Sequence, residues 1–195
     1  RDRPFFLCLH HFGVHSPLQA KPDWIERFQA RSGAGGHTHP VYAAMIASVD
    51  ESVGRLMATL EELGLTGRTL VIVSSDNGGV GGYAREGIQA RDTTDNAPLR
   101  GGKGMLYEGG IRVPWIFHWP GTVPAGQTSE VPITSVDLYP TLVELAGAPR
   151  PEGHVLDGVS LAALLRAGEA GRLGREAVFW HFPGYLGSGG GTWRT

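Results

Sequence analysis

The sequence predicts an α/β fold, with a mainly parallel sheet flanked by helices. Residues 4–10 (PFFLCLH) and 69–75 (TLVIVSS) each contain a nearly continuous apolar run, the pattern of strands that are covered on both faces. Between them, residues 40–63 repeat apolar side chains at intervals of three and four, as an amphipathic helix does. A strand, a helix and a second strand in one sheet form a right-handed crossover, so the two strands are predicted to be parallel.

The other elements are shorter, and prolines and glycines mark their ends. Pro40 suits the first turn of the long helix, and Gly64 suits the position after its last turn. A strand is predicted at 111–119, where Pro114 indicates a sheet edge or a bulge. Residues 80–98 lack any period and are predicted to form a long surface loop or lid. The sequence also predicts helices at 23–30 (capped by Asp23), 135–147 and 160–166, and a last strand at 176–182.

Composition and charge exclude several classes of protein. With 195 residues, 41% of them hydrophobic, the chain is long and apolar enough for one folded domain. A net charge of -2 provides no basic surface for nucleic acid, and no apolar run approaches the ~18 residues of a membrane span. The one cysteine, Cys8, forms no internal disulfide and is expected to be buried. Because the chain lacks an initiating Met and halts after a Gly/Ser tract, we expect it to be a piece of a longer polypeptide.

A candidate metal site follows the strand at 69–75. In open α/β sheets ligands bind beyond the carboxyl ends of the strands, where Asp76-Asn77-Gly78-Gly79 lies. Carboxylate and amide oxygens suit a hard cation such as Ca²⁺ or Mg²⁺, and glycine lets the backbone turn sharply. The alternative is an ordinary strand-to-turn connection, because Asn-Gly is a common turn sequence.

Two further loops carry candidate site residues. His15 lies in a proline-rich loop after the strand at 4–10, where an imidazole could donate to an anion or shuttle a proton; the alternative is a structural or surface histidine. Lys103 lies among Gly101, Gly102 and Gly104, which present its ammonium on a flexible backbone suited to a phosphate- or sulfate-like group. The spacing of a nucleotide-binding P-loop is absent.

Together these segments resemble a known family. In order along residues 4–165, the HSP loop, SSDNGG, LRGGKG, YEGGIRVPWIFHWPG and SVDLYPTLVELAG resemble the C-terminal part of the catalytic domain of type I sulfatases, in the alkaline-phosphatase superfamily. The resemblance implies that Asp76 and Asn77 bind an active-site Ca²⁺, with Mg²⁺ as the alternative, and that Lys103 and His15 contact the sulfate group. It also implies a division into residues 1–167 of the catalytic domain and the start of a C-terminal subdomain at 168–195. The WHFPGY segment resembles one near substrate-binding loops, which makes His181 a substrate-binding candidate beside a structural alternative.

The resemblance also shows what these residues lack. Sulfatases of this type use a formylglycine made from the Cys or Ser of a C/S-x-P-x-R motif, and the chain contains no such motif. The paired aspartates that complete the family's metal site are also absent, so we expect the N-terminal half of the same polypeptide to supply both. The substrate implied is a sulfated small molecule or carbohydrate, and the compartment is periplasmic, secreted or lysosomal. A phosphodiesterase or phosphonate hydrolase of the same superfamily and a catalytically silent remnant are the alternatives.

Overall fold

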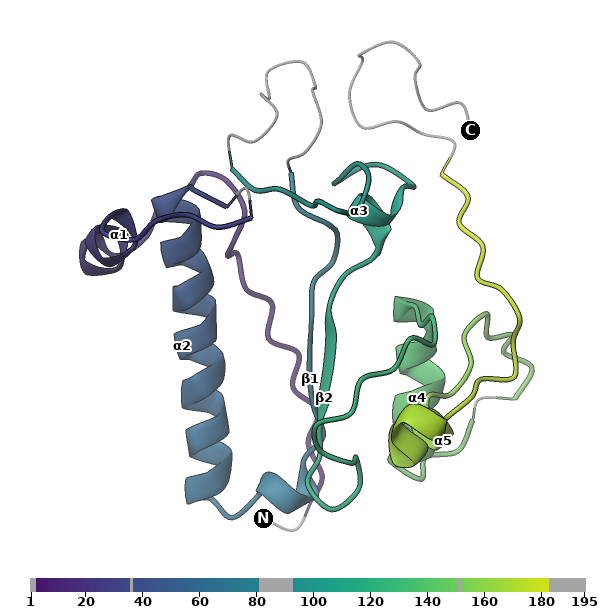
Figure 1. The fold of residues 1–195 in the computed structure, drawn as a ribbon. Helices are drawn as coiled ribbons and strands as arrows, with labels where there is room; N and C mark the ends of the chain where they lie inside the picture. Colours follow the sequence, from purple (N-terminus) through teal and green to yellow (C-terminus); the bar gives the residue numbers. More distant parts are fainter. Residues whose placement is uncertain (1–2, 36, 81–92, 151, 183–195) are drawn as a thin grey trace. The chain divides into compact units, whose positions relative to one another are not determined.

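The computed structural model describes residues 3–35, 37–80, 93–150 and 152–182 (Figure 1). These residues fall into two compact units. The first unit comprises Arg1–Glu62 and Asp76–Val113, and the second comprises Leu63–Ser75 and Pro114–Gly184. The loop or lid predicted at 80–98 falls largely on residues 81–92, outside the described residues. No helix in the described ranges is long and apolar enough to cross a membrane.

Helix α2 (Pro40–Glu62) dominates the first unit and confirms the helix predicted at 40–63. Ala44, Met45 and Leu60 form its buried positions. The shorter α1 (Pro22–Gln29) packs beside it, and the Lys21 ammonium lies 2.7 Å from the Glu51 carboxylate (Figure 1). Asp23 does not cap α1 as predicted, because the helix begins one residue earlier with Pro22 in its first turn.

The second unit contains a two-stranded antiparallel sheet. Strand β1 (Val71–Ser74) pairs with β2 (Trp115–His118), so that Ser74 lies opposite Trp115 (Figure 1). Side-chain hydrogen bonds join the two segments near both ends of the strand pair. Ser74 Oγ donates to Pro114 O at 3.0 Å, and Trp119 Nε1 donates to Gly67 O at 3.1 Å. A short 3₁₀ helix, η1 (Thr66–Arg68), precedes β1.

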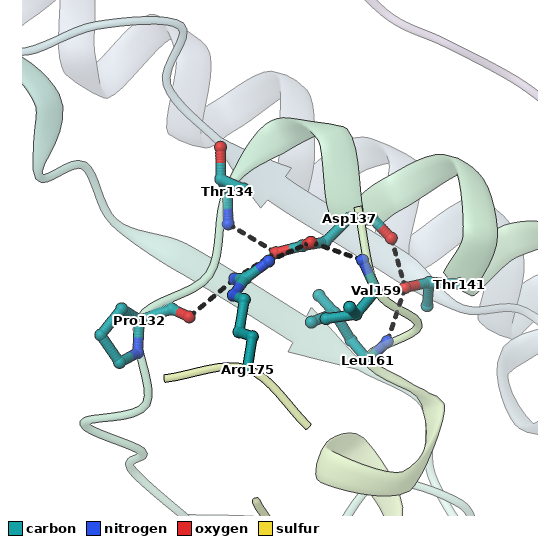
Figure 2. A network of polar contacts seen from close by, with 7 residues as sticks. All are labelled: Pro132, Thr134, Asp137, Thr141, Val159, Leu161 and Arg175. Atoms are coloured by element: carbon teal, nitrogen blue, oxygen red, sulfur yellow. Dashed lines mark hydrogen bonds and ion pairs between the residues drawn. The ribbon is translucent and has the colours of Figure 1, made fainter. Parts of the chain in front are cut away.

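The helices of the second unit pack around a buried carboxylate. The 3₁₀ helix η2 (Ser135–Asp137) leads directly into α4 (Leu138–Leu145), and α5 (Ala162–Ala167) is followed by η3 (Gly168–Ala170). The helices predicted at 135–147 and 160–166 are therefore confirmed over most of their length. Leu161 N donates to Thr141 Oγ1 at 2.8 Å, which joins the start of α5 to α4, and both residues are fully buried (Figure 2).

Asp137 is the centre of that packing. Its side chain is fully buried and accepts four hydrogen bonds (Figure 2). Arg175 donates one bond to each carboxylate oxygen, at 2.5 and 2.7 Å, and the Thr134 and Val159 amides donate the other two at 2.8 and 2.9 Å. Arg175 also donates to Pro132 O at 2.9 Å. The carboxylate thus ties η2 to the segment before α5 and to the chain that follows η3.

Several predicted strands are corrected by the structure. Residues 4–10 form no strand, and residues 176–182 form none either. β1 therefore has no parallel partner at 4–10, and its partner in the described residues is the antiparallel β2. The strand predicted at 111–119 is present only over Trp115–His118. Its first predicted residue, Ile111, belongs instead to a helical turn, α3 (Glu108–Ile111).

The strand predictions at 4–10 and 176–182 are wrong because an apolar run indicates burial but does not say which segment covers it. The large side chains of the 4–10 run are more than half exposed, with Phe6 at 76%. Cys8, expected to be buried, is exposed in the same run. The small sheet and the helices form an incomplete α/β domain.

Candidate active site

Two loops that carry predicted site residues meet in the first unit. The turn at 76–79 holds Asp76 and Asn77, and the loop at 101–104 holds Lys103. The Lys103 amide donates to Gly79 O at 3.0 Å, which fixes the backbone of the lysine against the end of the turn. The structure therefore brings together two of the predicted site segments.

Glycines make this close approach possible. Gly78 N donates to Gly110 O at 3.0 Å, and a Cβ added to Gly78 would lie 1.8 Å from Gly109 O. A Cβ on Gly109 would in turn lie 2.2 Å from Gly101 O. Real Cβ atoms do not approach oxygen so closely, so the turn, the lysine loop and α3 meet backbone to backbone. The positive φ of Gly101, 74°, is a second reason why that position takes glycine.

A side chain that the sequence reasoning missed also joins the two loops. Asn96 Nδ2 donates to Gly79 O at 2.9 Å and to Gly101 O at 3.0 Å. The sequence indicates a role for Asn96 only through its position a few residues before the glycine-rich LRGGKG segment. Asn-Ala-Pro is itself typical of a turn in a long loop, so no role is predicted.

The metal-binding candidates present oxygen atoms of suitable type. Asp76 is exposed, and Asn77 is half-buried with its Nδ2 donating to Gly78 O at 3.0 Å. A cation would bind Asn77 through Oδ1, the side-chain atom that takes no part in this bond. Ca²⁺ takes about six to eight oxygens, so these two residues fit one part of a coordination shell. Within the described ranges, no three or more His, Cys, Asp or Glu side chains group closely enough to hold a metal ion.

His15 lies in a turn of the first unit, exposed to solvent. Its amide donates to Phe12 O at 3.0 Å, and its Nδ1 lies 2.9 Å from Ser16 O. Because a carbonyl oxygen can only accept, Nδ1 carries a proton in this contact, and Nε2 is the ring atom that can exchange a proton with a substrate. The neighbouring Gly13 lies against α2, since a Cβ there would be 2.9 Å from Val49 Cγ2. Convergence of His15 with Lys103 and Asp76 stays a prediction.

His181 belongs to the second unit and is exposed. It lies in the extended segment after Arg175, whose side chain is anchored on Asp137. Its role in substrate binding also stays a prediction.

Comparison with known proteins identifies the family of this chain. The family model named Sulfatase matches residues 1–148. The chain belongs to the sulfatase family. It is 37% identical over 197 residues to a sulfatase of Formosa agariphila, covering 95% of this chain and 34% of that protein. It is also 37% identical to the steryl-sulfatase of Rattus norvegicus, covering 95% of this chain and 30% of the relative.

A solved structure supports the same assignment. The crystal structure of Ps i-CgsB in complex with k-i-k-neocarrahexaose superimposes with a TM-score of 0.67 at 36% identity, over 80% of this chain and 32% of that one. The resemblance to sulfatases and the incomplete α/β fold are thus confirmed. The chain spans about a third of the length of the relatives it matches.

Proposed function

We propose that these residues are the C-terminal part of a sulfatase catalytic domain and take part in hydrolysis of a sulfate ester. The observation that carries the proposal is the hydrogen bond between Lys103 N and Gly79 O, which holds the lysine loop against the Asp76–Asn77 turn. Family membership supplies the reaction class. In this proposal residues 1–167 belong to the catalytic domain, and residues 168–195 begin a C-terminal subdomain.

Asp76 and Asn77 would hold the active-site cation through their carboxylate and amide oxygens. Ca²⁺ is proposed, with Mg²⁺ as the less suitable ion, because Mg²⁺ demands tight octahedral geometry and keeps its water. When bound, the cation would polarise sulfate oxygens as a Lewis acid. The closely packed glycines behind the turn keep both side chains on a rigid backbone.

Lys103 and His15 would act on the sulfate group itself. The Lys103 ammonium would offset negative charge on a sulfate oxygen, and its backbone is already fixed by the bond to Gly79 O. His15 would hydrogen-bond or protonate the leaving alcohol through Nε2, because its Nδ1 is engaged with Ser16 O. His181 is proposed to contact the organic part of the substrate.

The nucleophile is proposed to be a formylglycine supplied by an upstream part of the same polypeptide. No C/S-x-P-x-R motif occurs in the 195 residues, and Cys8 is followed by Leu-His-His. We therefore expect the 195-residue chain alone to hydrolyse no sulfate ester. The measurement is release of p-nitrophenol from p-nitrophenyl sulfate, with a Lys103→Ala variant as the blank.

A sulfated carbohydrate or small molecule is the proposed substrate class. The similarity to Ps i-CgsB, whose structure holds k-i-k-neocarrahexaose, supports the carbohydrate. A periplasmic, secreted or lysosomal compartment is part of the same proposal, because it rests on the family resemblance.

The test of the lysine is a matched pair of variants in the whole enzyme, this chain joined to its upstream part. Lys103→Ala should lower kcat/KM for an aryl sulfate by about 100-fold or more, as removal of one transition-state donor does. Lys21→Ala removes an ammonium from the same unit and should leave kcat/KM unchanged, since Lys21 pairs with Glu51 at an exposed site. Equal activity of the two variants would refute the role of Lys103.

The test of the metal site is the Ca²⁺ requirement of Asp76→Asn. The variant keeps the shape of the side chain and loses its charge, so the Ca²⁺ concentration for half-maximal activity should rise at least about tenfold. Asp50→Asn makes the same change on the exposed face of α2 and should not alter this Ca²⁺ concentration.

Faster hydrolysis of an aryl phosphodiester than of an aryl sulfate would favour the phosphodiesterase alternative.

A further inference from the structure

The carboxamide of Asn96 spans the two loops of the candidate active site. Its Nδ2 carries two hydrogens and donates to Gly79 O at 2.9 Å and to Gly101 O at 3.0 Å. Gly79 closes the turn that begins with Asp76 and Asn77, and Gly101 lies two residues before Lys103. One side chain therefore links the backbone of both loops.

The link is reinforced at one of its ends. Gly79 O accepts from Lys103 N at 3.0 Å as well as from Asn96 Nδ2, so both lone pairs of this carbonyl point into the contact between the loops. Displacement of either donor would let the lysine loop move relative to the turn.

Asn96 is itself held in place. Its own carbonyl accepts from Leu99 N at 2.8 Å, which closes a turn around it. The neighbouring Thr94 is buried, and a Cβ on Gly79 would lie 2.6 Å from Thr94 Cγ2 and 3.0 Å from Asn96 Oδ1. The side chains of Thr94 and Asn96 therefore pack closely against the backbone of Gly79.

We propose that Asn96 is a positioning residue that sets the separation between the Asp76–Asn77 turn and Lys103, and so couples the cation site to the sulfate-binding lysine. The coupling to catalysis rests on the proposed function, whereas the clamp rests on the two hydrogen bonds alone. Asn96 touches no reacting group in this proposal and acts through the carbonyls of Gly79 and Gly101.

The experiment compares two substitutions in the whole enzyme. Asn96→Asp keeps the shape but places an acceptor against two carbonyl oxygens, and Asn96→Ala removes the donors without adding charge. Both should speed hydrogen exchange of the Lys103 amide about five- to tenfold, because its bond to Gly79 O loosens. Exchange at Leu60, buried in α2, should not change.

Kinetics form the second readout. With p-nitrophenyl sulfate as the probe, both variants should lose about tenfold or more in kcat/KM, the low end of what supporting partners of a metal site contribute. The thermal midpoint should stay within about 2 °C of wild type, because the two bonds lie at the loops rather than in the core. Gln29→Glu, which makes the same amide-to-acid change at an exposed position in α1, should alter none of these quantities.

The outcomes separate the inference from the function on which it rests. Unchanged Lys103 exchange in both variants would overturn the clamp, and so would faster exchange that extends equally through α2 with a lowered melting temperature. If the Lys103 amide exchanges faster than in wild type, α2 is unchanged and kcat/KM is unaltered, the coupling to catalysis would be overturned. A wild-type whole enzyme that hydrolyses no sulfate ester would refute the proposed function and not the clamp, because amide exchange reports the clamp without turnover.

Discussion

Replacing Asp137 by asparagine should destabilise the protein severely. Each carboxylate oxygen accepts one bond from Arg175 and one from a backbone amide, of Thr134 or of Val159. Whichever way the new amide is oriented, its NH₂ group faces two donors, so two bonds are lost and donors oppose donors. The side chain is fully buried, and water cannot replace those bonds.

The expected loss follows from these contacts. Removing one partner of a buried ion pair costs about 3–5 kcal/mol, because the other charge stays buried without compensation. Arg175 would be that charge, since its side chain is only 15% exposed. Against a typical margin of about 5–15 kcal/mol, the loss is large enough to unfold part of the population.

Urea denaturation followed by tryptophan fluorescence measures the effect. Asp157→Asn is the control, since Asp157 is exposed and should change the free energy of unfolding by less than about 0.5 kcal/mol. The double variant D137N/R175M should lose about 0.5–3 kcal/mol less than the sum of the two single variants, because it removes the orphaned charge. A loss below about 1 kcal/mol for Asp137→Asn would refute the reasoning.

Other consequences can be measured in the same way. Burial raises the pKa of Asp137, but the bonds from Arg175, Val159 and Thr134 outweigh it and hold the pKa below its ordinary value. Its contribution is therefore full above pH ~4 and is lost as the pH falls through the lowered pKa, so the stability gap between wild type and Asp137→Asn should narrow in acid titrations below about pH 4. Gly54→Ala should raise the melting temperature, because a Cβ there meets nothing within 4 Å and alanine favours a helix by about 1 kcal/mol. Gly78→Ala should instead cost about 1–3 kcal/mol or more and speed exchange at Lys103, since its Cβ would collide with Gly109 O; an unchanged melt would contradict this packing.

Helices could be predicted from the sequence because their signals are local. The spacing of apolar residues in 40–63 and the flanking Pro40 and Gly64 are all contained in one segment, and α2 ends within one residue of the prediction. The sheet could not be predicted in the same way. Pairing of Ser74 with Trp115 depends on two segments far apart in the sequence, and the apolar run at 4–10 does not say what covers it.

The candidate site divides along the same line. Asp76, Asn77 and Lys103 belong to short motifs of recognisable chemistry, so the sequence indicates them. Asn96 donates to backbone carbonyls of other segments. Every residue type carries such a carbonyl, so the sequence does not indicate which residues Asn96 bonds to. Asp137 lies inside the helix predicted at 135–147 without a role of its own, although Thr134 three residues before it is the usual mark of a capping box.

The antiparallel pairing of β1 with β2 also affects how the protein can vary in length. Ser74 and Trp115 are paired, so the ends of the connecting segment 75–114 are held together. This connecting segment, called the excursion here, carries the Asp76–Asn77 turn, Asn96 and Lys103. The entropy of closing a loop grows only with the logarithm of its length, and doubling the length adds about 0.6 kcal/mol. Relatives can therefore lengthen or shorten this excursion while the strand pair at its base persists.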